Sequence, residues 1–294
     1  MGLVGQDGAI LRQGRWPTPT RPTPAALVAW LMDHWARLWR EAGEPPLAGI
    51  GVSAPGPVDP QGAVLHRVFD WGWRDVPLPL EITRATGQPV RMDNDVNCCA
   101  LAEGHWGAAA GHGDFVWMQI STGVGGGLVS GGRIFRGAHG QAGEIGHIQI
   151  RRHGVRCACG RRGCLETCVS GPAILRRYRE SGAEAARTED VFAAARDGDR
   201  RALSLLRGVA DDLALAVDHV VNVVDPALVV LGGGVMAGFG PDLALVTASV
   251  ASRARRSGTT PPPVVPTALG GDAALLGAAA LLWGSTEPGS AGGR

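Results

Sequence analysis

Short apolar runs alternate along this chain with longer segments in which apolar residues recur at the spacing of an α-helix. The short runs predict strands over 2–4, 9–11, 47–53, 89–95, 115–120 and 226–235, and Gly131-Gly132 predicts the turn of a further hairpin. Helices are predicted over 25–42, 78–87, 97–109 and 272–283, and 170–221 is predicted to be mainly helical with breaks near Gly182 and Gly198. Alternating strands and helices are typical of the α/β class, which we expect here.

Two segments fall outside this alternation. Residues 17–24 read PTPTRPTP, which predicts an extended connection because proline favours that backbone conformation. Residues 285–294 are rich in glycine and serine, and we expect a disordered tail there. The full length of 294 residues suits two α/β lobes better than one.

The charged residues exclude some classes of function. All 28 basic residues are arginine, and lysine is absent. A P-loop places a lysine on the nucleotide phosphates, so the composition excludes that kind of nucleotide site. The formal net charge is only +1, and we expect no nucleic-acid partner. We also expect a cytoplasmic protein, because the sequence has neither a signal peptide at its start nor an apolar run of membrane-spanning length.

A cluster of cysteines is the strongest local signal. Cys157, Cys159, Cys164 and Cys168 fall within twelve residues. In a cytoplasmic chain such a cluster favours metal binding over disulfides. The first three share one glycine-rich turn and predict three thiolate ligands of a tetrahedral zinc. The fourth ligand is either His147, ten residues upstream, or Cys168.

The phrase DNDVN, residues 93–97, lies at the end of a predicted strand. Carboxylates at the carboxyl end of a strand face the crevice of an α/β fold. A kinase that acts on a hydroxyl group needs a carboxylate to accept its proton, so Asp95 is the candidate general base and Asn94 the candidate ligand of substrate hydroxyls. An Asn-Asp pair in this position is also typical of a turn or a helix cap.

Two glycine-rich phrases follow strands as well. In STGVGGG, residues 121–127, backbone N–H groups are exposed on a turn and can bind phosphate. The phrase LGGGV, residues 231–235, could let an adenine ring lie on bare backbone. Either phrase alone is equally consistent with a plain turn. Glu144, His147 and Glu166 flank the cysteines, where isolated glutamates are more often ordinary surface residues.

Taken together and in this order, these phrases resemble the ROK family (repressor, open reading frame, kinase). The resemblance runs from about residue 2 to 283 and is carried by GVSAPGPVD, DNDVNCCALAE, STGVGGGLVSGGRIFRGAHGQAGEIGH, CACGRRGCLE and VDPALVVLGGGV. It implies an ATP-dependent sugar kinase with an actin-like (ribonuclease H-like) two-lobed fold and an inter-lobe cleft. The lobes would be 1–95, with helix 272–284 packing back on it, and 96–271, which carries the zinc loop.

The resemblance also implies roles for individual residues. Asp95 would be the general base, and the sugar hydroxyls would be bound by Asn94, Glu144, His147 and Glu166. ATP with Mg²⁺ would lie with its phosphates near Thr122, Gly123 and Gly125 and its adenosine near Gly232, Gly233 and Gly234. A structural zinc would be held by His147, Cys157, Cys159 and Cys164. Such a zinc would order the sugar pocket without taking part in the reaction.

One departure from the family pattern concerns phosphate binding. Family kinases open with a strand that carries an Asp-x-Gly-Gly-Thr phosphate loop, and this phrase does not occur in the 294 residues. The resemblance places that strand just before Gly2, in the middle of the N-terminal sheet, with its aspartate helping to hold magnesium. Two interpretations follow: the chain was cut or misassigned at its start, or it phosphorylates nothing.

Other functions fit the sequence less well. A non-catalytic sugar sensor or a truncated ROK transcriptional regulator is the main alternative, although we expect no DNA-binding domain ahead of the sugar-kinase body. A zinc hydrolase would need an open coordination position, which four protein ligands would close. Glucose, N-acetylglucosamine and N-acetylmannosamine kinases share these motifs, and relatives are commonly homodimers or homotetramers.

Overall fold

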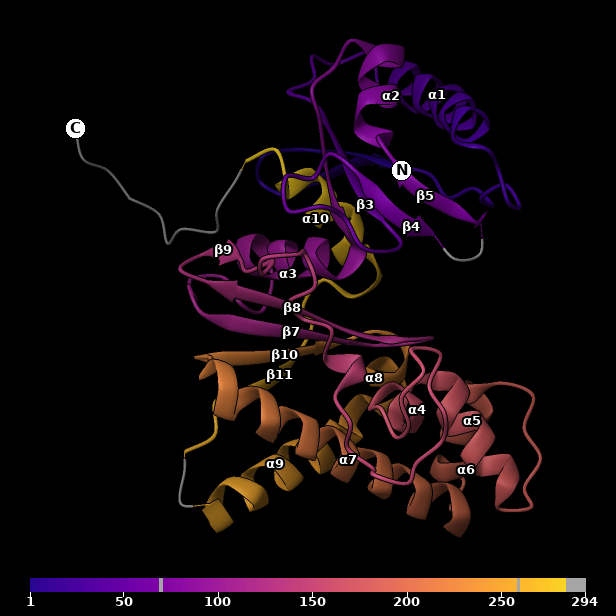
Figure 1. Ribbon diagram of the computed structural model, residues 1–294, viewed down its shortest axis with the longest axis vertical. Helices are drawn as coiled ribbons and strands as arrows, with labels where there is room; N and C mark the ends of the chain where they lie inside the picture. The colour runs from indigo at the N-terminus through magenta and orange to yellow at the C-terminus, as the bar shows by residue number, and fades with distance from the viewer. Residues whose placement is uncertain (69–70, 258–259, 284–294) are drawn as a thin grey trace. The chain divides into compact units, whose positions relative to one another are not determined.

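The computed structural model describes residues 1–68, 71–257 and 260–283 (Figure 1). The chain divides into two compact units, and each combines strands with helices. The first unit comprises Met1–Gly113, Gly127–Ala142 and Gly271–Arg294, and the second comprises Asp114–Gly126 and Gly143–Gly270. The α/β class predicted from the sequence is confirmed.

Three two-stranded sheets lie in the described part of the first unit. Strands β1 (Gly2–Val4) and β2 (Ile10–Gln13) form an antiparallel hairpin, as do β4 (Leu65–Val68) and β5 (Trp73–Val76). Strands β3 (Ile50–Ala54) and β6 (Val90–Asn94) pair in parallel, with Ile50 opposite Val90 and Ala54 opposite Asn94. The carboxyl ends of β3 and β6 therefore meet at one edge, where functional side chains collect in α/β folds.

Four helices complete the first unit: α1 (Pro24–Glu41), α2 (Leu78–Thr86), α3 (Asp95–Trp106) and α10 (Ala273–Ala280). Helix α1 begins where the Thr23 hydroxyl accepts a hydrogen bond from the backbone N–H of Ala26, with proline in its first turn. Helix α2 ends at Gly87, which adopts the left-handed conformation open to glycine (φ 69°). Buried apolar residues of α1, α2 and the strands form a common core, including Leu27, Leu65, Trp73, Ile82 and Met92.

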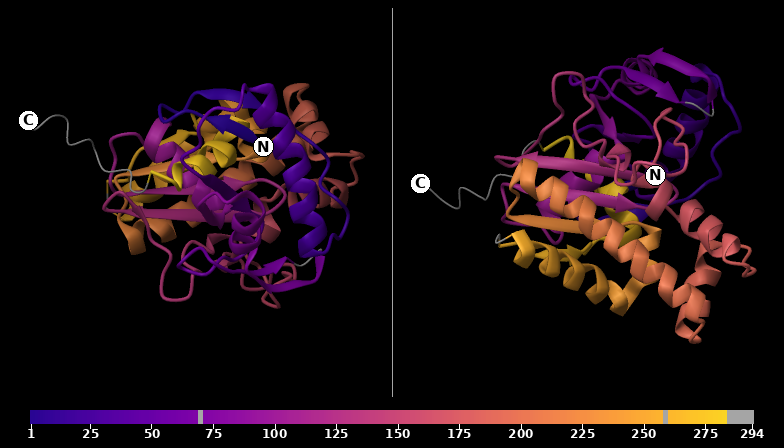
Figure 2. Two further views of the ribbon diagram at one scale, coloured as in Figure 1. Left: turned by 90° about the horizontal axis from the view of Figure 1, so that it is seen from above. Right: turned by 60° about the horizontal axis from the view of Figure 1, so that its bottom comes forward.

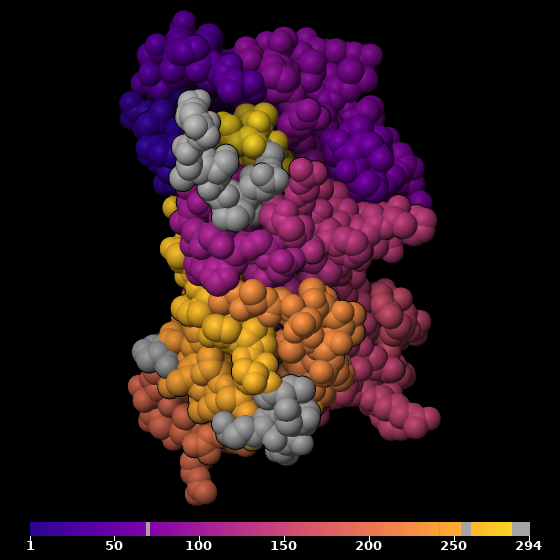
Figure 3. All heavy atoms as spheres, turned by 90° about the vertical axis from the view of Figure 1, so that its left-hand side faces the viewer, coloured from indigo at the N-terminus to yellow at the C-terminus, as the bar shows by residue number. Residues whose placement is uncertain are grey.

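Helix α10 brings the C-terminal part of the chain into the first unit. A Cβ atom on Gly277 would lie 1.7 Å from the carbonyl oxygen of Cys98 in α3, and one on Gly51 of β3 would lie 1.7 Å from the carbonyl oxygen of Ala278. Only glycine permits these approaches, so backbone contacts hold α10 against both elements. Figure 3 shows the yellow surface of this segment beside indigo residues from the start of the chain.

A five-stranded sheet with the order β11-β10-β7-β8-β9 includes the strands of the second unit. These are β7 (Phe115–Ile120), β10 (Leu228–Gly232), β11 (Val264–Pro266) and the first residues of β8 (Val124–Ser130). The rest of β8 and β9 (Arg133–Ile134) belong to the first unit. Strand β10 runs parallel to both β7 and β11, so the glycines after it share an edge with those after β7.

The helices of the second unit are α4 (Glu166–Val169), α5 (Gly171–Glu180), α6 (Thr188–Arg196), α7 (Arg200–Val224), α8 (Gly234–Phe239) and α9 (Leu243–Ser257). Helices α7 and α9 lie side by side along the sheet (Figure 2). Across the described residues, no helix has both the length and the apolar character needed to cross a membrane.

Several predicted boundaries differ from those in the structure. Helix α3 begins at Asp95 rather than at residue 97, and the first unit continues past residue 95 because α3 belongs to it. The predicted breaks near Gly182 and Gly198 separate α5, α6 and α7, and both glycines have positive φ angles. The β4–β5 hairpin, α8, α9 and β11 were not predicted. The tail expected at 285–294 lies outside the described residues.

Candidate functional site

Asn94 and Asp95 occupy the junction between β6 and α3 in the first unit. The side-chain oxygen of Asn94 caps the helix by accepting a hydrogen bond of 2.7 Å from the backbone N–H of Asn97. Asp95 is the first helical residue, half-buried, and its Oδ1 accepts the backbone N–H of Val96 at 3.0 Å. A helix N-terminus stabilises negative charge, and Asp95 lies in the first turn of α3.

The loop after β3 approaches this junction within the same unit. The Asp59 carboxylate organises the loop by accepting the backbone N–H groups of Ala63 at 2.6 Å and Gln61 at 3.3 Å. A Cβ atom on Gly62 would lie 2.6 Å from the carbonyl oxygen of Met92 in β6, so the loop lies directly on that strand. This loop over 55–64, called here the Pro-Gly loop, and the Asn94–Asp95 pair thus share one edge of the first unit.

Asp93 is a residue that the sequence analysis left without a role. It is 2% exposed and forms an ion pair with Arg136, 43 residues later in the chain. A carboxylate near the carboxyl end of a strand predicted to be buried could have indicated such a pair, because buried charges require partners. Its partner could not be read from local spacing.

The glycine turn between β7 and β8 is connected to Glu166 in the second unit. The backbone N–H of Val124 donates to Oε2 of Glu166 at 3.1 Å, and a Cβ atom on Gly123 would lie 3.1 Å from the same oxygen. The carbonyl oxygen of Ser121 accepts the backbone N–H of Gly171 at the start of α5. Thr122 at the tip is exposed, and Gly125 is half-buried. The turn and the predicted sugar ligand Glu166 therefore form one local structure.

The glycines after β10 have two different surroundings. A Cβ atom on Gly232 would lie 1.9 Å from the ring of Trp117, and one on Gly233 would lie 2.3 Å from the carbonyl oxygen of Ile120. Contact with β7 explains why both positions are glycine. Gly234 is exposed, and a Cβ atom there would meet only the Ser121 hydroxyl at 3.9 Å. Of the three glycines, Gly234 is the one whose side-chain direction is open.

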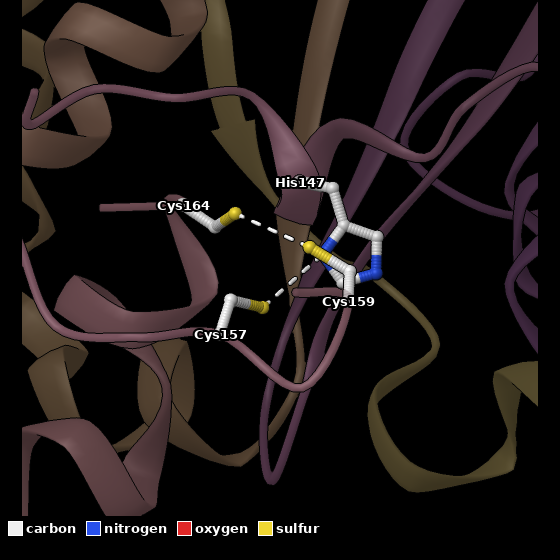
Figure 4. A group of neighbouring side chains, drawn as sticks. All are labelled: His147, Cys157, Cys159 and Cys164. Carbon is white, nitrogen blue, oxygen red and sulfur yellow. Dashed lines mark hydrogen bonds between the residues drawn. The ribbon is translucent and has the colours of Figure 1, made fainter. Parts of the chain in front are cut away.

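His147, Cys157, Cys159 and Cys164 converge in the second unit (Figure 4). One ligand atom from each lies within 4.8 Å of all the others. The Sγ atom of Cys157 is 3.6 Å from Nδ1 of His147, and the Sγ atoms of Cys159 and Cys164 are also 3.6 Å apart. Tetrahedral zinc with Zn–S bonds of about 2.3 Å requires donor separations of roughly 3.5–3.8 Å. The set fits zinc in both geometry and chemistry, since thiolates and imidazole are preferred zinc ligands.

The backbone of the cysteine loop supports this arrangement. The backbone N–H of Cys157 donates to the carbonyl oxygen of Arg161 at 2.8 Å, which closes the turn that carries Cys159. Gly163 has a φ of 69°, and a Cβ atom there would lie 1.6 Å from the carbonyl oxygen of Arg151. Glycine is required at this position to let the loop fold back on itself.

The thiols of the loop differ in acidity. Hydrogen bonds from the backbone and side chain of Arg161 lower the pKa of the exposed Cys159 to about 6. Burial raises the pKa of Cys164 to about 12, and it also raises the pKa of Cys168. Cys159 is thus the cysteine most readily available as a thiolate for a metal.

Cys168 is not part of the cluster. It lies in α4, where its Sγ atom is 3.9 Å from the hydroxyl of Thr167. The alternative that Cys168 replaces His147 as fourth ligand therefore finds no geometric support among the described residues.

The two nitrogens of His147 point to different groups. Nδ1 faces the thiols, whereas Nε2 lies 3.9 Å from Oε2 of Glu144, which is exposed. One imidazole can therefore ligate a metal through Nδ1 and contact a polar group through Nε2. Of the predicted site residues, Asn94 and Asp95 belong to the first unit, and all the others belong to the second.

Comparison with known proteins gives a consistent family. The profile of the ROK family matches residues 1–284. The chain is 33% identical over 301 residues to a glucokinase of Thermotoga maritima, and the alignment covers 96% of this chain and 93% of that protein. It is 39% identical over 260 residues to a kanosamine kinase of Amycolatopsis mediterranei, covering 86% and 82% of the two chains.

A solved structure is similar over nearly its whole length. It is a ROK family glucokinase from Streptomyces griseus in complex with glucose and AMPPNP, 30% identical, with a TM-score of 0.77 over 95% of this chain and 94% of that chain. Xylose repressors of Bacillus are also similar in sequence to this chain.

Proposed function

The chain belongs to the ROK family as a glucokinase-like sugar kinase. On that premise we propose that it transfers the terminal phosphoryl group of ATP to a hydroxyl group of a hexose or an N-acetylhexosamine. In this reaction Asp95 is the general base. The observation that carries the proposal is the place of Asp95 at the first position of α3, after a strand whose carboxyl end also holds the Pro-Gly loop. There the carboxylate is oriented by its hydrogen bond with the backbone N–H of Val96.

In this proposal Asp95 accepts the proton of the sugar hydroxyl as that oxygen attacks the terminal phosphorus of ATP. Asn94 binds sugar hydroxyls through its amide nitrogen, because its amide oxygen is used to cap α3. Glu144 and the Nε2 of His147, 3.9 Å apart, bind further hydroxyls together with Glu166. Positioning and electrostatic stabilisation supply most of the catalysis in phosphoryl transfer.

We assign ATP to the glycines of the second unit. Thr122, Gly123 and Gly125 would hold the phosphates with Mg²⁺, and Gly232, Gly233 and Gly234 would lie along the adenosine. The open side-chain direction at Gly234 supports this role for it, whereas contacts with β7 already account for the glycines at 232 and 233. Glu166 holds the turn that carries Gly123, so the sugar and phosphate ligands would be coupled through that turn.

Zinc, when bound, would supply structural cross-linking rather than reaction chemistry. Four protein ligands leave no open position for a reacting water. Since Nδ1 of His147 would bind the metal, the orientation of its Nε2 toward the sugar would be fixed by the metal site.

A coupled assay with ATP, Mg²⁺ and a panel of sugars tests the proposal. The panel contains glucose, N-acetylglucosamine, N-acetylmannosamine and kanosamine, with xylose as the comparison. We expect phosphorylation of at least one hexose or amino sugar and none of xylose. Complete absence of phosphorylation, with sugar binding still detected by calorimetry, would replace the kinase with the second candidate.

That second candidate is a non-catalytic sugar sensor or a truncated ROK regulator. It is favoured by the similarity to xylose repressors. We place the protein in the cytoplasm, supported by six cysteines that form no disulfide. A homodimer or a homotetramer remains the expectation for its assembly.

A further inference from the structure

The carboxylate of Asp93 is buried at the carboxyl end of β6, immediately before Asn94 and Asp95. Its Oδ1 accepts the backbone N–H of Asn94 and the side-chain amide of Asn97, each at 2.8 Å. Its Oδ2 accepts Nε of Arg136 at 2.9 Å and Nη2 of the same side chain at 2.5 Å. Every one of these bonds connects Asp93 either to the β6–α3 junction or to Arg136.

Arg136 lies at the start of a short loop in the same unit. Its carbonyl oxygen accepts the backbone N–H of Ala142 at 3.1 Å, which closes the loop over 136–142. Within this loop a Cβ atom on Gly140 would lie 2.6 Å from the carbonyl oxygen of Val58. The loop thus lies against the Pro-Gly loop, and Arg136 joins both to the end of β6.

Charge gives this connection its strength. A carboxylate that is 2% exposed is costly unless it is paired, and two donors on one oxygen supply that pairing. The other oxygen is then held in place to orient Asn94 and Asn97. Removing the arginine would leave an unpaired charge directly beside the residues that position the general base.

We propose that Arg136 is a positioning residue for the kinase reaction, which through Asp93 fixes the Asn94–Asp95 junction against the loop over 136–142. This inference rests on the proposed function of Asp95. Arg136 itself touches Asp93 and not the reacting atoms, so its removal should misplace the base and the sugar while leaving ATP binding intact. A displacement of about 1 Å can lower turnover by roughly 100-fold.

The test compares Arg136→Met, Arg136→Lys, Asp93→Asn and the double variant Arg136→Met/Asp93→Asn. Arg91→Met is the matched control, since Arg91 is an exposed arginine on β6, the strand that carries Asp93. We expect Arg136→Met to lower kcat and to raise the sugar KM, so that kcat/KM for the sugar falls by roughly 10- to 100-fold. The KM for ATP should not change. Lysine cannot supply two donors from one planar group, so Arg136→Lys should recover only part of the loss.

The double variant separates positioning from simple stability. It removes the buried charge together with its partner and keeps an amide at position 93, so it should fold even if Arg136→Met does not. Its loss of kcat/KM should be smaller than the product of the two single losses, because the two residues act as one unit. Losses that multiply independently, or variants with lower melting temperatures but unchanged kcat and sugar KM, would overturn the proposal.

Failure of the proposed function would look different. If the wild-type chain and Arg91→Met phosphorylate no sugar, the kinase assignment fails and sugar affinity measured by calorimetry becomes the readout. Arg136→Met should then weaken glucose binding by roughly 10-fold or more, whereas Arg91→Met should not. Equal affinities in the two variants would remove the positioning role.

Discussion

At the scale of single residues, the proposed mechanism gives the side chains of the β6–α3 junction both a structural and a chemical role. The oxygen of Asn94 caps the helix, which leaves its amide nitrogen for a substrate. Asp95 accepts the N–H of Val96 through Oδ1, so the carboxylate is oriented before any sugar arrives. The capping and catalytic interpretations of this sequence are therefore compatible, because each group has more than one hydrogen-bonding atom.

Replacement of Asp95 by asparagine tests its role as a base. Asparagine keeps the shape of the side chain and an oxygen that can accept the N–H of Val96, but it cannot take up a proton. We expect kcat to fall by roughly 10²–10⁴ while sugar affinity changes little. Steady-state kinetics and calorimetry measure the two quantities.

The matched control for this variant is Asp7→Asn. Asp7 also accepts a backbone N–H through Oδ1, that of Ala9 at 3.0 Å, but it lies in the exposed β1–β2 turn. Its kcat should equal that of the wild type. Near-normal turnover in Asp95→Asn would remove Asp95 from the mechanism.

At the scale of single elements, the cysteine loop is ordered by a few local bonds and, in our proposal, by a bound zinc. Only a short turn and the 3₁₀ helix Ile145–His147 supply the four ligands. A loop with so little regular structure depends on cross-linking for its order. Metal loss should therefore loosen the loop and, with it, the orientation of His147.

Zinc content provides the corresponding prediction. Cys159→Ser should lose zinc and melt at a lower temperature, because it removes one of four ligands. Cys168→Ser is the matched control and should keep about one zinc per chain, since Cys168 lies outside the cluster. Elemental analysis and thermal melts check both variants. Zinc retained by Cys159→Ser but lost by Cys168→Ser would show that the ligand set is wrong.

Ion pairs of a buried aspartate anchor the cysteine loop to helix α7. Asp212 of α7 is 7% exposed and accepts Arg151 at 2.7 Å and Arg177 at 3.3 Å. Arg151 lies just before the cysteine turn, and Arg177 of α5 also donates to the carbonyl oxygen of Cys168 at 2.7 Å. One buried carboxylate therefore holds the loop, α4 and α5 together.

Asp212→Asn should lower the stability of the chain measurably. The amide keeps the shape but loses the charge that pairs with two arginines, at a cost of about 1–3 kcal/mol. The neighbouring Asp211→Asn is the control, because Asp211 is exposed and accepts only the hydroxyl of Ser249 among the contacts described. Urea unfolding of both variants measures the difference. Equal midpoints would show that the buried network contributes nothing.

The same scale shows what the sequence could and could not predict. The clustering of His147, Cys157, Cys159 and Cys164 was predictable because these residues are close in sequence and chemically distinctive. The β1–β2 hairpin and α5 to α7 were predictable from their glycines and caps. Helix α8 was missed because it has six residues, and β11 because a strand of three residues carries too little periodicity. The Asp93–Arg136 pair was missed because its partners meet only after β9 folds against α3.

At the scale of the whole molecule, the described part of the first unit holds β1, β2, β3 and β6 as two separate two-stranded sheets. Strand β1 pairs with β2 and β3 pairs with β6, and the described residues provide no strand that joins these two sheets. Helix α10 contacts both sheets, since a Cβ atom on Gly2 would lie 2.9 Å from the Leu275 side chain and one on Gly51 would lie 1.7 Å from the Ala278 carbonyl oxygen. The family resemblance places a further strand between these two sheets, which would pair with the backbone of both.

This arrangement leads to a prediction about an added segment. A chain that carries, before Met1, one strand followed by an Asp-x-Gly-Gly-Thr turn should pair with β1 and β3, melt at a higher temperature and bind ATP more tightly. The strand would form backbone hydrogen bonds with β1 and β3, and the turn would supply phosphate contacts and a magnesium ligand. The control carries the same residues in scrambled order, so that length and composition are unchanged. Thermal melts and the coupled kinase assay compare the original chain, the extended chain and the scrambled control. We expect a higher melting temperature and a higher kinase activity for the extended chain alone. If the chain of 294 residues phosphorylates a sugar as well as the extended one and melts at the same temperature, the β1 and β3 edges need no such partner and the placement of the strand is wrong.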